Sequence, residues 1–136
     1  MEPNSSAAPL AAAGPLGSAD GAFVIVEWEA PADRIGPTQP VAPFHVHHGD
    51  DEAWYVLEGA LGFRLGDREV EARAGSGVFA PRGVAHAYWN AGPGPARYLL
   101  VMTPALLRLI EELHVAPLPG REAVETIFRK YDSELL

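Results

Sequence analysis

The stretch Pro43-Phe44-His45-Val46-His47-His48-Gly49-Asp50-Asp51-Glu52 decides the fold that we expect for this chain. His45 and His47 are two residues apart, so on a β-strand they point to the same face. A Gly-Asp-Asp turn follows, and Glu52 then opens an apolar run. Strand, turn and returning strand therefore bring two imidazoles and a carboxylate onto one wall. This donor set suits a divalent first-row metal, and His86 is a fourth candidate ligand further along the chain.

Short runs of β-branched and aromatic residues surround this stretch and predict a mainly β fold. The first is Phe23–Glu29, and further strands are expected near 44–48, 53–58, 60–66, 68–74, 77–80, 85–90 and 96–102. Turn signals rich in Gly and Pro separate them, and the chain holds 14 Gly and 13 Pro. Many short strands with regular turns are typical of a sandwich or barrel.

The two ends of the chain differ from this middle part. Residues 1–20 are rich in Ala, Pro, Gly and Ser, which predicts a flexible N-terminal tail. We expect a β-barrel over 21–103. Thr103-Pro104 is a helix-start signal, and apolar residues recur at helical spacing after it, first from Leu106 and again from Val124. Residues 104–136 are therefore predicted to form two α-helices packed on the barrel.

Composition limits the classes of partner. The 136 residues suit one domain, and the formal charge of -8 argues against nucleic acid and anionic membrane surfaces. No apolar run reaches membrane-spanning length, and the N-terminus lacks the positive charge of a secretory signal, so we expect a cytoplasmic protein. The absence of Cys means that nitrogen and oxygen must hold any metal.

Two motifs in this chain resemble those of the cupin superfamily. The first is His45-x-His47, four residues, Glu52, six residues and Gly59; the glycine that usually stands six residues before the first His is replaced by Gln39. The second motif is complete, with Gly75, Pro81, Gly83, His86 and Asn90 at the expected spacing. Within the superfamily, the runs Asp51–Gly59 and Pro81–Asn90 are most similar to small single-domain, quercetin-dioxygenase-like (cupin 2) proteins.

The resemblance implies a double-stranded β-helix, or jelly-roll barrel, in which His45, His47, Glu52 and His86 bind one divalent metal ion. The metal would be Fe, Mn, Ni, Cu or Zn, because three imidazoles and one carboxylate do not single one out. It also implies a metal-dependent, dioxygenase-like enzyme that acts on a small aromatic or enolic compound. Glu52 would serve as a ligand or as the catalytic base. Because small cupins often pair, we expect a homodimer.

Strand alternation suggests what surrounds the metal. It places Trp54 and Val56 on the inward face with Glu52, and Tyr88 and Asn90 on the inward face with His86. Phe79, beside the Pro81 turn, is expected to add to the wall of a substrate pocket. Such a wall favours a flat or apolar small molecule. The alternative is that these aromatic side chains simply fill the barrel.

For the function, two alternatives stay open. The first is a non-catalytic module that binds or senses a small ligand, and the second is a metal-dependent isomerase or lyase. A cavity lined by Arg, Lys and Asn would favour the isomerase, and Arg64, Arg73, Arg82 and Arg97 are candidates to bind an anionic substrate.

Overall fold

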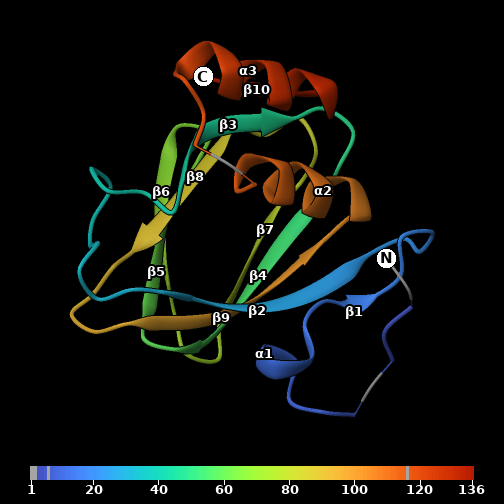
Figure 1. Cartoon of the computed structure of the whole chain (residues 1–136). Coiled ribbons are helices and arrows are strands. Elements are labelled where there is room, and N and C mark those ends of the chain that lie inside the picture. The colour runs from blue at the N-terminus through green and yellow to red at the C-terminus, as the bar shows by residue number, and fades with distance from the viewer. Residues whose placement is uncertain (1–2, 6, 116) are drawn as a thin grey trace.

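Two antiparallel sheets face each other in a computed structural model of the chain, which describes residues 3–5, 7–115 and 117–136 (Figure 1). The first sheet has the order β1 (Leu16–Gly17), β2 (Val24–Ala30), β9 (Ala96–Met102), β4 (Glu52–Glu58) and β7 (Gly77–Ala80). The second has the order β10 (Ser133–Leu135), β3 (Ala42–His47), β8 (His86–Asn90), β5 (Ala60–Leu65) and β6 (Arg68–Arg73). The neighbours β9 and β4, or β3 and β8, are distant in sequence, as in a double-stranded β-helix.

The core lies between the sheets and follows from strand alternation. In β9, the side chains of Ala96, Tyr98, Leu100 and Met102 are buried, and the residues between them are partly exposed. Facing side chains from the other strands fill the same space, and Trp54 packs edge-on against Phe63 with ring centroids 5.1 Å apart. Burying a side chain of this size stabilises a fold by about 1.5–3 kcal/mol.

Glycines permit the tight turns that close this barrel. Gly59, between β4 and β5, has φ 76°, and a Cβ there would lie 2.6 Å from the Pro95 carbonyl oxygen, so only glycine fits. In the loop before β3, the positive φ of 94° falls on Gly36. The Gln39 amide donates to the Gly36 carbonyl at 3.1 Å in the same turn. The first motif usually has a glycine where this chain has Gln39. Here the glycine of the same turn is Gly36, three residues earlier.

Two helices cover one end of the barrel (Figure 1). Helix α2 (Pro104–Leu113) begins after Thr103, whose hydroxyl oxygen accepts a hydrogen bond from the Leu106 amide at 3.2 Å. It buries Leu106, Leu107 and Leu109 against the sheets. Helix α3 (Arg121–Lys130) buries Phe128 and leads into β10. The predicted mainly β fold with two C-terminal helices is confirmed.

Each predicted strand is present, and the largest difference in position is at β3, which was expected to begin at 44 and begins at Ala42. Sequence reasoning did not predict β10. Of the expected N-terminal tail, residues 1, 2 and 6 lie outside the described residues, and the rest includes α1 (Leu10–Ala13) and β1, which pairs with β2. The flexibility of this segment stays a prediction. Among the described residues, the helices are too short or too polar to cross a membrane.

Candidate metal centre

Four side chains from both sheets meet inside the barrel: His45, His47, Glu52 and His86. His45 and His47 lie on β3, and His86 lies on β8 directly opposite His45. Glu52 reaches them from β4 of the other sheet. One ligand atom from each residue can be chosen so that all four lie within 4.8 Å of one another. All four side chains are buried. The sequence prediction that these residues come together therefore agrees with the structure.

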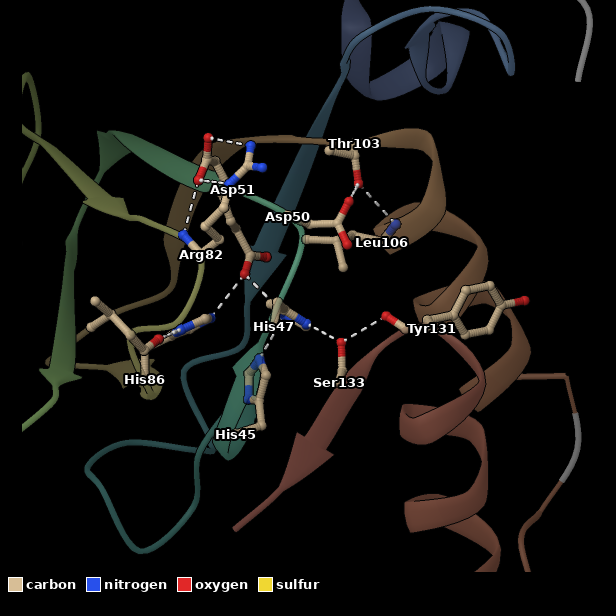
Figure 2. Close-up of polar contacts among 12 residues, drawn as sticks. His45, His47, Asp50, Asp51, Arg82, His86, Thr103, Leu106, Tyr131 and Ser133 are labelled. Atoms are coloured by element: carbon tan, nitrogen blue, oxygen red, sulfur yellow. Dashed lines mark hydrogen bonds and ion pairs between the residues drawn. The ribbon is translucent and has the colours of Figure 1, made fainter.

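The shortest contacts in this cluster join the Nε2 atoms and the carboxylate. His45 Nε2 lies 3.1 Å from His47 Nε2. Glu52 Oε1 lies 3.4 Å from His47 Nε2 and 2.9 Å from His86 Nε2. Figure 2 shows the three imidazoles, His45, His47 and His86, gathered around this contact. The three imidazoles therefore turn the same nitrogen towards one point.

In His45 and His86 the contact of Nδ1 fixes the position of the ring proton. His45 Nδ1 lies within hydrogen-bond distance of the Pro43 carbonyl, and His86 Nδ1 lies 3.0 Å from the Val84 carbonyl. A carbonyl oxygen only accepts, so both Nδ1 atoms must carry the hydrogen. In the neutral imidazoles the lone pair is then on Nε2, which faces the centre of the cluster. Backbone carbonyls that orient ligand imidazoles in this way are common around bound metals.

The electrostatics favour a neutral His45 beside an ionised Glu52. Burial and the neighbouring imidazoles of His86 and His47 lower the pKa of His45 to about 3. Although burial opposes it, contact with His47 and His86 lowers the pKa of Glu52 to about 2. Burial also opposes the shift at His86, but the Glu52 carboxylate raises the pKa of that imidazole. Glu52 is therefore ionised at neutral pH.

These residues fit a divalent metal ion. Neutral His45 carries its hydrogen on Nδ1, so its bare Nε2 faces His47 Nε2 at 3.1 Å, and the Glu52 carboxylate adds a negative charge beside them. Such a cluster of lone pairs repels itself unless a cation lies at its centre. Three imidazole nitrogens and one carboxylate oxygen suit Fe, Mn, Ni, Cu or Zn, and the donor set alone does not choose among them.

Two turns hold the ligands in place from outside the cluster. Asp51 accepts hydrogen bonds from the Arg82 amide at 2.9 Å and from its guanidinium at 3.2 Å. The Gly83 amide donates to the His47 carbonyl at 2.7 Å. These contacts join the turn before β4 to the turn before β8. Asp51 therefore helps to place Glu52 relative to His86.

A cavity of about 530 Å³ opens onto the cluster between the two sheets and the helices. His45, His47 and Glu52 form part of its lining. Most of the rest is apolar or aromatic, and it includes Trp28, Val41, Pro43, Leu100, Leu106, Leu109, Ile110, Leu113, Val124 and Phe128. The polar lining includes the two phenols of Tyr88 and Tyr98, whose oxygens are 2.8 Å apart. A small, largely apolar organic molecule suits this space.

The residues expected to line a substrate pocket lie in different places. Tyr88 lines the cavity. Trp54 and Val56 point inwards but are buried among core side chains. Asn90 is also buried, and its side-chain nitrogen donates to the carbonyls of Pro31 and Gly94, so it holds loops together.

The structure does not bring Phe79 to this cavity, because it is 57% exposed on the outer face of β7. Ala80, the partner of Glu52 in the strand register, takes the inward position instead. Tyr98 and Phe128 line the cavity and were not predicted to do so. The alternation of Tyr98 with Leu100 and Met102 is the signal that could have placed Tyr98 inside.

The four candidate arginines for an anionic substrate lie away from this cavity. Arg64 lies over the Phe44 ring, and Arg73 pairs with the exposed Glu71. Arg82 is held by Asp51, as described above, and Arg97 lies 3.5 Å from Glu27. Among the described residues that line the cavity there is no Arg or Lys.

The family model of the Cupin domain matches residues 34–102, which include all four ligands and both motifs. The chain belongs to the cupin superfamily. This small cupin is 31% identical over 71 residues to the tetracenomycin polyketide synthase protein TcmJ of Streptomyces glaucescens. The match covers 52% of this chain and 47% of TcmJ, so the chain spans about half the length of that relative.

Solved cupin structures are also similar. Iron(II) HppE is 27% identical with a TM-score of 0.51, over 60% of this chain and 43% of HppE. A sugar phosphate isomerase of the cupin superfamily from Silicibacter pomeroyi is 26% identical with a TM-score of 0.51, over 61% of this chain and 51% of that protein. HppE has been solved with iron(II) and with cobalt(II), so this fold holds divalent metals elsewhere.

Proposed function

We propose that this cupin is a metal-dependent, dioxygenase-like enzyme that acts on a small aromatic or enolic compound. The observation that carries the proposal is the cavity of about 530 Å³, largely apolar, that opens directly onto His45, His47 and Glu52. A compound in this cavity would lie with an oxygen beside His45, His47 and Glu52, which would hold the metal, and with its apolar body against the helices. A barrel filled to the metal by its own side chains would have favoured a non-catalytic module instead.

The charge of the cavity argues against a phosphorylated substrate. Sugar phosphate isomerases are among the similar structures, and a phosphate group needs cationic partners such as Arg or Lys. Along the described lining no such side chain is found, while Glu29, Glu52 and Glu111 contribute carboxylates. The isomerase alternative is therefore less well supported than the oxygenase.

The two cavity phenols suit an oxygenated ligand. Burial raises the pKa of Tyr98 to about 12 and also raises the pKa of Tyr88, so both hydroxyls keep their protons at neutral pH. One hydroxyl donates to the other across 2.8 Å, which leaves one O–H of the pair for another acceptor. The carbonyl or enol oxygen of a bound compound is such an acceptor.

When bound, the metal would supply Lewis-acid activation of an enol or phenol and a site for reaction with oxygen. His45, His47 and His86 would hold it through Nε2, and backbone carbonyls orient His45 and His86 through their Nδ1 atoms. Glu52, whose pKa is held low by two imidazoles, would serve as an anionic ligand. Its second proposed role, as the base that takes a substrate proton, would require it to move off His47 and His86 so that its pKa rises.

The relative TcmJ narrows the compounds worth testing. Its name assigns it to a polyketide synthase. Polyketides are chains of alternating carbonyl groups that enolise and cyclise to phenols, and both forms match the apolar cavity with its phenolic donor. We therefore include a 1,3-diketone and a polycyclic phenol with flavonols and catechols among the candidate substrates.

Oxygen uptake tests the proposal. The protein is loaded separately with Fe, Mn, Ni, Cu and Zn, each compound is first bound without oxygen, and consumption is followed after oxygen is admitted. Uptake is expected with at least one metal and compound, and it should disappear in His47→Gln but persist in the surface variant His48→Gln. Binding without uptake across the whole panel would overturn the oxygenase and favour the non-catalytic ligand-binding module.

A further inference from the structure

The last strand brings a hydroxyl to the metal centre from outside the matched cupin region. β10 pairs antiparallel with β3, and Ser133 lies directly opposite His47 in this pairing. Directly opposed residues in an antiparallel pair point to the same face, so Ser133 faces inwards with His47. Its side chain is buried, with 1% of the residue exposed. The Cupin domain match ends at 102, so this contact is an addition of the C-terminal segment.

The Ser133 hydroxyl fixes the protons on His47. Its oxygen lies 2.7 Å from His47 Nδ1 and 3.0 Å from the Tyr131 carbonyl oxygen (Figure 2). The carbonyl only accepts, so the single hydroxyl proton of Ser133 is donated to Tyr131. The Ser133 oxygen must then accept from Nδ1–H of His47. This leaves the Nε2 lone pair of His47 facing His45 and Glu52, as a metal ligand requires.

Several contacts hold Ser133 in this position. The residue before it, Asp132, has φ 54°, and its carbonyl accepts from the His48 amide at 3.0 Å. Tyr131, at the end of α3, donates its phenol hydrogen to Glu112 of α2 at 2.6 Å. The segment is therefore fixed both to β3 and to the other helix, which limits how far the hydroxyl can move.

We propose that Ser133 is a positioning residue of the metal centre, which holds His47 in the ligating tautomer and so makes metal affinity depend on the C-terminal segment. The inference rests on the proposed metal site. The other two imidazoles have backbone carbonyls for this purpose, and His47 alone depends on a side chain among the three. Loss of such an outer hydrogen-bond partner typically weakens metal affinity about 10–100-fold.

The test compares metal affinity in three variants with that of the wild type. Ser133→Ala removes the hydroxyl, and Ser133→Thr keeps it. Glu134→Ala is the matched control, because Glu134 lies on the same strand and contacts the exposed His48 at 3.0 Å instead of a ligand. Zinc and cobalt dissociation constants are measured by competition with a chromophoric chelator, and the visible spectrum of the cobalt form reports ligand geometry.

We expect Ser133→Ala to bind about 10–100-fold more weakly with an altered cobalt spectrum, and the other two variants to stay within about threefold of wild type. A folded Ser133→Ala with wild-type affinity and spectrum would overturn the inference. If Ser133→Ala does not fold, Ser133→Thr decides. A folded Ser133→Thr protein that keeps the hydroxyl but binds metal about tenfold more weakly than wild type would also overturn the inference. If wild-type protein binds no metal, the proposed metal centre is wrong. If the variants show the expected affinities but no oxygen is consumed, only the oxygenase proposal is wrong.

Discussion

Replacing His47 by Ala should abolish the stabilisation of this protein by metal, and replacing the adjacent His48 should not. His47 Nε2 lies 3.1 Å from His45 Nε2 and 3.4 Å from Glu52 Oε1 inside the cluster. The His48 side chain is 43% exposed and contacts a surface carboxylate, Glu134, that is itself 58% exposed. A pair exposed to this degree contributes about 0–1 kcal/mol.

The size of the effect follows from mass action. A metal present at about 100 times its dissociation constant stabilises the folded state by about 2.7 kcal/mol if it does not bind the unfolded chain. For a chain of 136 residues, about 1 kcal/mol corresponds to roughly 4 °C in Tm. We therefore expect added metal to raise the Tm of wild type and of His48→Ala by about 10 °C, and to change that of His47→Ala by less than about 3 °C.

The assay is thermal unfolding of chelator-treated protein with and without Zn, Mn or Co. It compares the metal-dependent increment within each variant, because His47→Ala also leaves the Ser133 oxygen without its donor and lowers the starting Tm. Metal content of the purified proteins provides a second measurement. An undiminished increment in His47→Ala would refute the ligand assignment, and loss of the increment in His48→Ala would show that the two histidines were assigned the wrong way round.

Three further changes have defined outcomes. The double variant Tyr88→Phe/Tyr98→Phe removes both cavity hydroxyls, and calorimetry should show about tenfold weaker binding of an enolic ligand with metal content unchanged. Thr103→Ala removes the cap of α2 and should lower the free energy of unfolding by about 1 kcal/mol in urea titrations, whereas Thr103→Ser should cost much less. The pKa of His45 is about 3 in the metal-free folded state and 6.5 in the unfolded chain. Between these two pH values the unfolded chain binds a proton on His45 and the folded state does not. The stability of wild type relative to His45→Gln should therefore fall as pH is lowered from 6.5 towards 3, by at most about 1.4 kcal/mol per unit, and a constant difference would contradict this.

The strands and the ligand cluster could be predicted because their signals are local. Apolar alternation bounded by Gly and Pro defines each strand, and the spacing from His45 to Glu52 places a turn between two inward-facing groups. The pairing of β3 with β8, which sets His86 opposite His45, is not local and was not predicted. The second motif indicated only that His86 joins the other three residues, and we expected its strand to lie across the cavity. The expected homodimer and cytoplasmic location stay predictions.

The cavity could not be predicted in the same way. Alternation tells which residues point into a barrel but not which end of the barrel is packed solid and which is hollow. Val56 therefore shares a face with Glu52 and yet lies in the core, whereas Tyr98 and Phe128 line the cavity. Ser133 was missed because β10 has only three residues and directly follows a helical pattern, so no strand signal marks it.

The contact between Ser133 and His47 spans 86 positions along the chain, which has a consequence for how the proposed metal ion would enter its site. Contacts between such distant segments carry a high loop-closure cost and tend to form late in folding. An ion that reaches the chain before α3 has docked meets a His47 ring that is still free to rotate. Tight loading should therefore follow docking of the C-terminal segment, and refolding mixtures should capture the ion in a slow phase that tracks this docking.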